Sequence, residues 1–173
     1  ENVEKQKEKL EKPHEYMDGE IFKVLGKDVV LRITYEKTKK AKLKLKRNQF
    51  FVILPRDEEQ NVKTQVKKMI DKFYKELAEK EVERAMRKMT MKVGIAPNSY
   101  KVKNLKSTWG NCATTGNISI NRNVVKYSRH AIEYVCLHEI CHLQNMNHSK
   151  MFWDMVEKYM ADYEKAEEEL KNG

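Results

Sequence analysis

The stretch His138-Glu139-Ile140-Cys141-His142, followed six residues later by His148, decides how the rest of this chain is interpreted. On a helix, residues four positions apart lie one above the other, so His138 and His142 can direct two imidazoles at one point. Glu139 is rotated from His138 by about 100° at about 3.6 residues per turn. Its carboxylate is thereby kept off a metal but within reach of a metal-bound water. The pattern predicts a zinc hydrolase site with an open coordination position.

His148 is the predicted third ligand, and it requires the helix to end before it. Six residues of unbroken helix amount to a rotation of about 600°, which would point His148 away from the metal. The intervening Asn145-Met146-Asn147 favours a helix end, because asparagine tolerates the left-handed conformation in which many helices stop. The three histidines have the metzincin spacing, with Asn145 where those enzymes have glycine. Met151 follows too closely to be a metzincin Met-turn, so we interpret it as a packing residue.

The alternative is that the His-Glu-x-x-His pattern arose by chance on an amphipathic helix, since such short motifs do give false positives. The context argues against chance. The surrounding pattern is helical, the predicted break lies where the third ligand needs it, and three of the five histidines fall between positions 138 and 148. We therefore interpret this segment as a metal site.

Length and composition predict a single domain over residues 1–173, with residues 1–14 as a charged N-terminal segment that resembles a truncated helix. Apolar residues make up 40% of the chain, enough to bury a core. The formal net charge is +9, which favours acidic partners such as nucleic acid or nucleotides. The lysines are spread over many faces without an interleaved aromatic stripe, which is more typical of a solvated surface. The oligomeric state does not follow from the sequence.

The cysteines and the hydropathy indicate a compartment. Cys112, Cys136 and Cys141 are odd in number and show no CxxC pairing, which favours a reducing environment. We interpret Cys136 and Cys141 as small buried residues. No run of about 18 apolar residues and no signal peptide is present, so we predict no membrane association and a cytoplasmic location. The chain starts at Glu1 without an initiator methionine, which is consistent with a fragment of a longer protein.

The N-terminal half changes from a strand pattern to a helix pattern at Pro55. Four segments with the alternation of strands precede it, and we predict an antiparallel meander: residues 21–24, 29–35, 43–45 and 50–54. Apolar residues then recur at helical spacing over residues 57–92, which predicts one long helix, or two with a bend near residues 78–81. Gly94 is the predicted stop of this helix, and its methionines are interpreted as core residues.

The C-terminal half predicts a hairpin followed by helices. Residues 100–105 and 107–112 are extended, and Thr115-Gly116-Asn117 forms a turn into Ile118-Ser119-Ile120. Ser128 is the predicted N-cap of the helix that carries the histidines and runs to about Leu143. A short helix after His148 and an acidic helical tail over residues 163–170 complete an α+β chain.

Four segments resemble the YgjP-like metallopeptidase family. They are residues 105–112 (LKSTWGNC), 116–121 (GNISIN), 132–143 (IEYVCLHEICHL) and 147–153 (NHSKMFW). The resemblance is specific from about Leu105 to Tyr163 and weaker back to about Tyr16. It implies a zincin-like fold related to the SprT-like and WLM proteases. It also implies a metal held by His138, His142 and His148, with Glu139 as the catalytic base.

The chain departs from the family pattern at three positions. Thr108 stands where the family usually has arginine, Asn111 where it has serine, and Ala161 where it has proline. None of these belongs to the predicted metal set. The missing arginine puts in doubt any substrate contact or structural pairing that this side chain makes in the family. Family members also tend to have further strands ahead of a segment such as residues 1–12.

The leading functional prediction is a zinc-dependent metallopeptidase with one Zn²⁺ per chain and peptides or unfolded proteins as substrates. Zinc lowers the pKa of its bound water towards about 7, and Glu139 would take the proton as the water attacks a carbonyl. Two alternatives remain: a metal-dependent phosphohydrolase that acts on nucleotides, and a non-catalytic nucleic-acid-binding module with a structural metal. A structural site usually closes its fourth position with Cys or His, and Cys141 faces another way on the helix.

The remaining candidates are weaker. The hairpin around Trp109 and Ile118 offers an edge with which an extended peptide could pair, or its side chains simply pack in the core. Tyr127, Tyr134 and Arg122 are candidates for oxyanion stabilisation only because they lie nearby in the chain. His14 and His130 are isolated histidines, for which a surface or helix-end role is expected.

Overall fold

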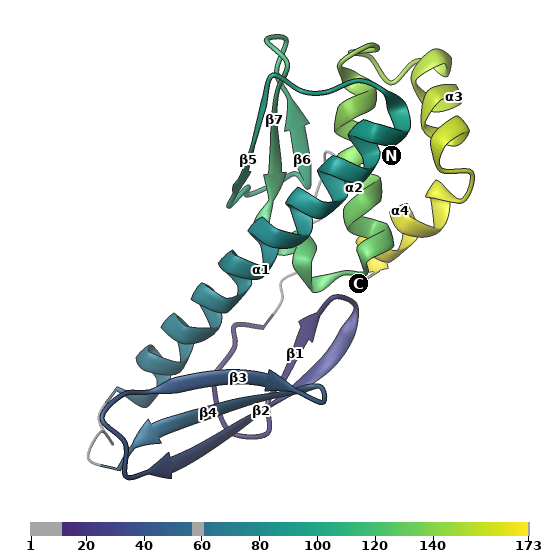
Figure 1. Cartoon of the computed structure of the whole chain (residues 1–173). Helices are drawn as coiled ribbons and strands as arrows, with labels where there is room; N and C mark the ends of the chain where they lie inside the picture. Colours follow the sequence, from purple (N-terminus) through teal and green to yellow (C-terminus); the bar gives the residue numbers. More distant parts are fainter. Residues whose placement is uncertain (1–11, 57–60, 173) are drawn as a thin grey trace.

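The computed structural model describes residues 12–56 and 61–172, and Figure 1 shows that they form an elongated α+β molecule. A four-stranded sheet lies at one end, and a long helix leads from it to a second, smaller sheet and three further helices. The α+β prediction is confirmed. Of the predicted charged segment 1–14, residues 1–11 lie outside the described ranges. Among the described residues, no helix combines the length and the apolar character needed to cross a bilayer.

The first sheet contains the four strands that the sequence predicts. They are β1 (Ile21–Val24), β2 (Lys27–Glu36), β3 (Lys42–Lys46) and β4 (Gln49–Pro55). β1 pairs with β2 and β3 pairs with β4, both antiparallel. Each pair is joined by a two-residue turn in which both residues have positive φ: Leu25 and Gly26 at 50° and 80°, Arg47 and Asn48 at 50° and 58°. Such turns match the right-handed twist of the strands that they connect.

The predicted antiparallel meander is wrong in one respect, because the strand order is β1-β2-β4-β3 and β2 runs parallel to β4. Burial explains this order. Phe50, Val52 and Leu54 of β4 are fully buried, which favours an interior strand. β3 alternates lysine with leucine and is largely exposed, which suits an edge. The alternation of residues identifies the strands, but it does not say which strands become neighbours.

α1 (Val62–Val93) is one continuous helix of 32 residues, not two. It ends at Gly94, as predicted, where φ is +81° and the amide donates to the carbonyl of Thr90 at 2.8 Å. Its first half packs Val66 and Ile70 against the four-stranded sheet in a first hydrophobic core. Its second half contributes Val82, Ala85, Met86 and Met89 to a second core, which confirms the packing role predicted for these two methionines, whereas Met91 of the same helix is exposed. The helix therefore connects the two ends of the molecule (Figure 1).

The second sheet contains β5 (Ser99–Lys103), β6 (Gly110–Cys112) and β7 (Asn117–Asn121) in the order β5-β7-β6. β6 and β7 form the predicted hairpin, and β5 joins β7 in parallel. Trp109 and Ile118 are buried in the second core, which confirms the packing interpretation of these side chains. β6 remains an edge strand, and it lies next to the helix that carries the histidines.

That helix, α2 (Arg129–His142), lies at the centre of the second core, with all residues from Ala131 to His142 buried. The predicted cap is confirmed, because the Ser128 hydroxyl accepts a hydrogen bond from the Ala131 amide at 3.2 Å. A short 3₁₀ helix, η1 (Arg122–Lys126), precedes it, and α3 (Lys150–Tyr159) and α4 (Tyr163–Asn172) follow it. The turn between β1 and β2 donates two backbone hydrogen bonds to η1, which joins the first sheet to the helical end.

Candidate metal centre

The structure brings His138, His142 and His148 together into one cluster. Their Nε2 atoms form a nearly equilateral triangle, with separations of 3.2, 3.1 and 3.2 Å. Two of the rings are fully buried and that of His148 is half-buried. The predicted convergence of three imidazoles is therefore present, although His148 lies ten residues from His138 in the chain.

The chain reverses direction between His142 and His148 in a different conformation from the one expected. α2 ends at His142, and its C-cap residue, Leu143, keeps a right-handed conformation with φ of −61°. Asn145 is not among the described residues with positive φ, so the left-handed stop predicted there is wrong. Instead, the Asn145 carbonyl turns back and accepts a hydrogen bond from Nδ1 of His142 at 3.0 Å.

This hydrogen bond places a proton on Nδ1 of His142, because a carbonyl oxygen can only accept. In the neutral imidazole, Nε2 then presents its lone pair to the other two rings. The same residue thus ends the helix and orients a potential metal ligand. The sequence predicts only the helix break at Asn145, because a hydrogen bond of a backbone carbonyl leaves no trace in the pattern of side chains.

Aromatic rings from α3 hold the three imidazoles in place. The buried ring of Phe152 stacks on His142 with centroids 4.4 Å apart, and it meets His138 and His148 edge-on at 4.9 and 5.0 Å. Trp153 stacks on His148 at 6.0 Å. The sequence marks Phe152 only as part of an apolar helix face, so its central position beneath the triangle was not predicted. These contacts restrict the orientation of the rings before any ligand binds.

Glu139 lies beside the triangle and is fully buried, with Oε1 4.0 Å from Nε2 of His138. Gly110 of β6 makes room for this carboxylate. A Cβ at position 110 would lie 3.0 Å from Cγ of Glu139 and 3.2 Å from the carbonyl oxygen of Ser119. The glycine therefore allows the strand edge to approach the glutamate more closely than any other residue would.

The triangle fits a small divalent cation. In tetrahedral zinc sites the metal–nitrogen distance of about 2.0–2.1 Å places two imidazole nitrogens about 3.3–3.4 Å apart. The observed 3.1–3.2 Å is close to this separation. Three nitrogens at such distances repel one another through their lone pairs unless a proton or a cation lies between them.

No cysteine or carboxylate completes the set within the described ranges, where the three histidines are the only group of ligand atoms that converges. Cys141 is buried, and burial raises the pKa of its thiol to about 12, aided by the nearby Glu139 charge. A thiol in that state is a poor metal ligand, since the thiolate is the form that binds. The described donor set is three imidazoles, as in catalytic zinc sites.

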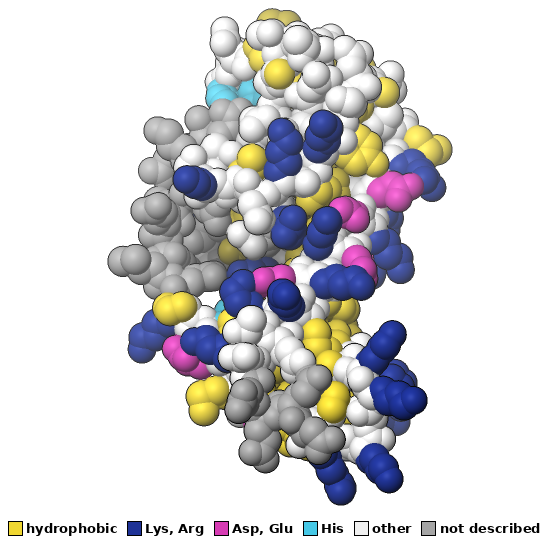
Figure 2. Space-filling model, turned by 90° about the vertical axis from the view of Figure 1, so that its left-hand side faces the viewer, with side chains coloured by type: hydrophobic (Ala, Val, Ile, Leu, Met, Phe, Trp, Pro, Cys, Tyr) yellow, Lys and Arg dark blue, Asp and Glu magenta, His cyan; other side chains and the backbone are white. Residues whose placement is uncertain are grey.

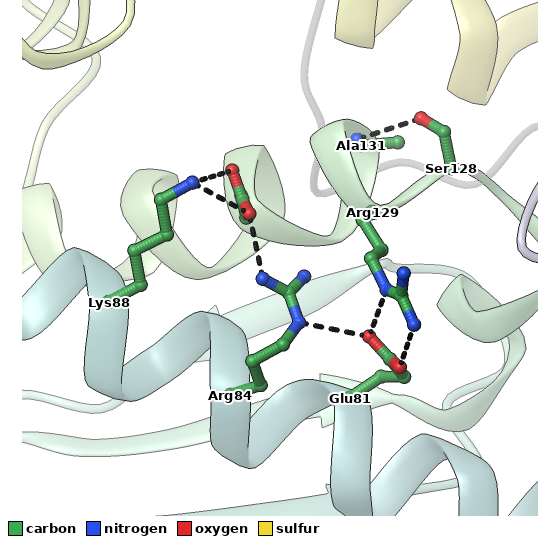
Figure 3. A network of polar contacts seen from close by, with 7 residues as sticks. Glu81, Arg84, Lys88, Ser128, Arg129 and Ala131 are labelled. Atoms are coloured by element: carbon green, nitrogen blue, oxygen red, sulfur yellow. Dashed lines mark hydrogen bonds and ion pairs between the residues drawn. The ribbon is translucent and has the colours of Figure 1, made fainter.

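An ionic network attaches α2 to α1, as Figure 3 shows. The buried carboxylate of Glu81 accepts two hydrogen bonds from Arg129, at 2.9 and 3.0 Å, and one from Arg84 at 3.0 Å. Arg84 also donates to Glu133 at 3.0 Å, and Lys88 does so at 3.1 Å. The hydrogen bonds from Arg129 are the main cause of a lowered pKa of Glu81, opposing the effect of burial. The network fixes the position of the helix that carries two of the histidines.

α4 holds α2 from the other side through two carboxylates. Glu169 accepts hydrogen bonds from the amide and the hydroxyl of Ser128, at 2.7 and 2.6 Å. Glu167 accepts one from the hydroxyl of Tyr134 at 2.7 Å. The acidic tail predicted from the sequence is thus helical, and two of its acidic residues contact α2 and the N-cap residue of α2.

The other candidates from the sequence lie away from the triangle or are engaged elsewhere. The Tyr134 hydroxyl binds Glu167, and the ring of Tyr127 packs edge-on against Trp109 at 5.0 Å. Arg122 lines a cleft that includes Lys67 and Tyr16, on the side of the first sheet.

The two isolated histidines pair with carboxylates outside the cluster. His14 lies 2.7 Å from Glu20 and stacks on Phe22 at 4.1 Å. His130 lies 3.4 Å from Asp162. Neither joins the triangle, as expected.

Comparisons with known proteins identify a family and two similar solved structures. The sequence model of a family described as "YgjP-like, metallopeptidase domain" matches residues 1–173. Two similar solved structures are the metallopeptidase zymogen of Pyrococcus abyssi abylysin (22% identity, TM-score 0.46) and that of Methanocaldococcus jannaschii jannalysin (18% identity, TM-score 0.45). Each alignment covers 50% of this chain, and 89% and 84% of the respective relative. No curated protein matches.

Proposed function

This chain belongs to the YgjP-like metallopeptidase domain family, and from that premise we propose that it is a zinc-dependent peptidase. In this proposal His138, His142 and His148 hold the metal, and Glu139 is the general base. The observation that carries the proposal is the triangle of Nε2 atoms with sides of 3.1–3.2 Å beside a buried carboxylate. Three neutral imidazoles and one adjacent base form the minimal set for metal-assisted hydrolysis.

The bound zinc would supply Lewis acidity, lowering the pKa of a water and polarising the scissile carbonyl. Glu139 takes the proton from that water and returns it to the leaving amine, because it is the one carboxylate beside the triangle among the described residues. Asn145, Phe152 and Trp153 act through the histidines by holding the orientation of their rings.

The edge of the second sheet is the proposed substrate platform. β6 is the edge strand nearest to α2, and Gly110 places its backbone against Glu139. An extended peptide that pairs with β6 would bring a peptide bond close to the carboxylate. The peptide would then be held by backbone hydrogen bonds, which do not depend on its side chains. This mode favours an unfolded segment of a protein over a folded one.

A purely structural metal is the alternative that this arrangement disfavours. Structural zinc sites usually have four protein ligands, whereas the described residues offer three. Glu139 is also costly to bury as an unused charge, and a role as a base accounts for its position. We propose that residues 1–173 act together as one catalytic unit.

The experiment that tests the proposal is cleavage of an unfolded protein, such as reduced casein, by zinc-loaded protein. We expect a chelator to abolish cleavage, added Zn²⁺ to restore it, and Glu139→Gln to lower it by a factor of about 10²–10⁴ while zinc content stays the same. Undiminished cleavage by Glu139→Gln would refute the assigned base. Release of phosphate from nucleoside triphosphates without proteolysis would point to a phosphohydrolase instead.

A further inference from the structure

The most basic segment of the chain lies at the end of the molecule remote from the histidines. Residues 37–47 read KTKKAKLKLKR, with seven lysines and arginines and no acidic residue. They include the whole of β3, which is an edge strand of the first sheet. Figure 2 shows Lys and Arg side chains projecting from the lower end of the molecule, where this sheet lies.

The strand register places three of these lysines on one face. Lys42, Lys44 and Lys46 alternate with Leu43 and Leu45, so the lysines point to one side of the sheet and the leucines to the other. Leu43 packs against the first core. The lysines therefore lie on the outer face of the sheet, opposite α1, and all three are exposed.

The outer face is not uniformly polar, because β4 contributes apolar side chains between the charges. Phe51 is half-buried there, and it is flanked in the register by Arg32 of β2 on one side and Lys44 of β3 on the other. Ile53 occupies the corresponding place in the next row, beside Lys42. The face thus presents an aromatic ring and an aliphatic side chain within a field of cations.

The acidic residues of this face lie near the ends of strands, among them Glu36 at the end of β2. Asp18 lies 3.9 Å from Arg32, and Asp28 pairs with Lys23 near the β1–β2 turn. In the described part of the chain, no carboxylate forms an ion pair with Lys42, Lys44 or Lys46. A ligand with several negative charges would supply what the sheet lacks.

We propose that this outer face, made of Arg32, Lys42, Lys44, Lys46, Phe51 and Ile53, binds single-stranded nucleic acid. Lysines two apart on a strand are separated by about 6.6–6.8 Å, a spacing that can follow successive phosphates of an extended strand. Phe51 offers a π-face on which an unpaired base can stack. An acidic protein would match the lysines but would leave the ring without a flat partner, and the bases of a duplex would not be available to it.

The nucleic-acid site is independent of the peptidase site. α1 separates the two, since its first half packs on the inner face of the first sheet and its second half packs near the metal helix. A protein that binds a nucleic acid through its first sheet could act on a nearby polypeptide at its histidine cluster. The binding property itself holds whether or not the protein cleaves peptides.

The experiment measures binding of the full chain to fluorescein-labelled single strands of DNA and of RNA over a range of salt concentrations. The Lys42→Gln/Lys44→Gln/Lys46→Gln variant should weaken binding at least tenfold and reduce the slope of log K against log[salt] by about 2, since each phosphate contact contributes about 0.7. Phe51→Leu should weaken binding by about tenfold and leave the slope unchanged, because it removes stacking and no charge.

The matched control is Lys68→Gln/Lys75→Gln/Lys80→Gln, which removes the same charge from exposed positions on α1. Affinity and slope close to those of the unaltered protein are expected for this variant. Equal losses of affinity in both triple variants would show that only net charge matters. If the unaltered protein did not bind either strand, the lysines would serve only to protect the strand edge from pairing. Either result overturns the proposal. Tighter binding of a poly-glutamate peptide than of either single strand would do so as well. Circular dichroism checks that each variant is folded.

Discussion

The two sheets of this protein share one strand arrangement and differ in what lies against their edges. In each, the last strand of three lies between the other two and runs parallel to the first: β2-β4-β3 at one end and β5-β7-β6 at the other. The edge strand β6 lies next to the buried helix α2, with Gly110 against Glu139. The edge strand β3 carries lysines into solvent.

The difference shows that topology alone does not create a site. A free strand edge offers backbone hydrogen bonds to any partner, and most proteins protect it. Lysines do so at β3, where they also create a charged face. At β6 the edge is short and free of a side chain at position 110, and a carboxylate and three imidazoles lie behind it. Chemistry therefore depends on what packs behind the edge, which differs between the two ends.

The largest effect is expected from His148→Ala, which removes one corner of the triangle at the second end. Zinc affinity should fall by more than 100-fold, because one of three protein ligands is lost. Isothermal titration calorimetry with Zn²⁺ measures this directly. His130→Ala is the matched control, since His130 begins the same helix but pairs with Asp162 outside the cluster. Unchanged zinc affinity in His148→Ala would exclude it as a ligand.

Gly110→Ala tests whether the close approach of β6 matters. The added Cβ would lie 3.0 Å from Cγ of Glu139 and should displace its carboxylate. Because a misplacement of about 1 Å costs roughly 10²-fold, we expect kcat/KM for peptide cleavage to fall by about 10- to 100-fold, with zinc content unchanged. Asn111→Ala, at the exposed neighbouring position, is the control. Equal activities of the two variants would show that the close approach of β6 at Gly110 does not affect peptide cleavage.

Glu81→Gln tests how α2 is held at the end with the histidines, where ion pairs join it to α1 in addition to their apolar contacts. The loss of charge-assisted hydrogen bonds to Arg84 and Arg129 should cost about 1–3 kcal/mol of unfolding free energy. The pKa of Glu81 is lowered in the folded state. Its contribution is therefore complete above the ordinary glutamate value of 4.5 and is lost as the pH falls through the lower folded pKa.

Urea unfolding of the unaltered protein and Glu81→Gln at several pH values measures this contribution. The difference between the two should be constant from about pH 5 to 7 and shrink in more acidic solution. A difference that grows towards low pH would mean that the folded state raises the pKa of Glu81 instead.

The smallest effect is expected at the other edge. Replacing Lys42, Lys44 and Lys46 together by glutamine should change the unfolding free energy by no more than about 0.5 kcal/mol, because these side chains are exposed and form no ion pair with a described carboxylate. Peptide cleavage should also be unaffected. A large loss of stability in thermal unfolding would show that these three lysines contribute to the folded state of the first sheet.

The elements and the histidine cluster could be predicted because their signals are local. Alternation marked the strands, and an apolar spacing of three to four residues marked α1. The turn of helix between His138 and His142 follows from helical geometry alone. The approach of His148 to the other two histidines was predictable because a hydrolase site needs a third ligand. The way in which α2 ends was not predictable.

What could not be predicted depends on contacts between segments far apart in the chain. β4 lies between β2 and β3, and its Phe50 is buried in the first core. The alternation of residues in the sequence does not show which strands become neighbours in the sheet. The sequence places Gly110 only within an extended segment, because the role of this glycine depends on its contact with Glu139, 29 positions further along. The ion network of Glu81 likewise joins helices that show no pairing signal in sequence.

The most direct test of the central claim is an anomalous difference map, recorded at the zinc absorption edge, from crystals of the zinc-loaded protein. We expect one strong peak about 2.0–2.1 Å from Nε2 of each of His138, His142 and His148, with the Glu139 carboxylate beside it but not bound. A peak coordinated by Cys141 or by Glu139, or no peak within the triangle, would contradict it.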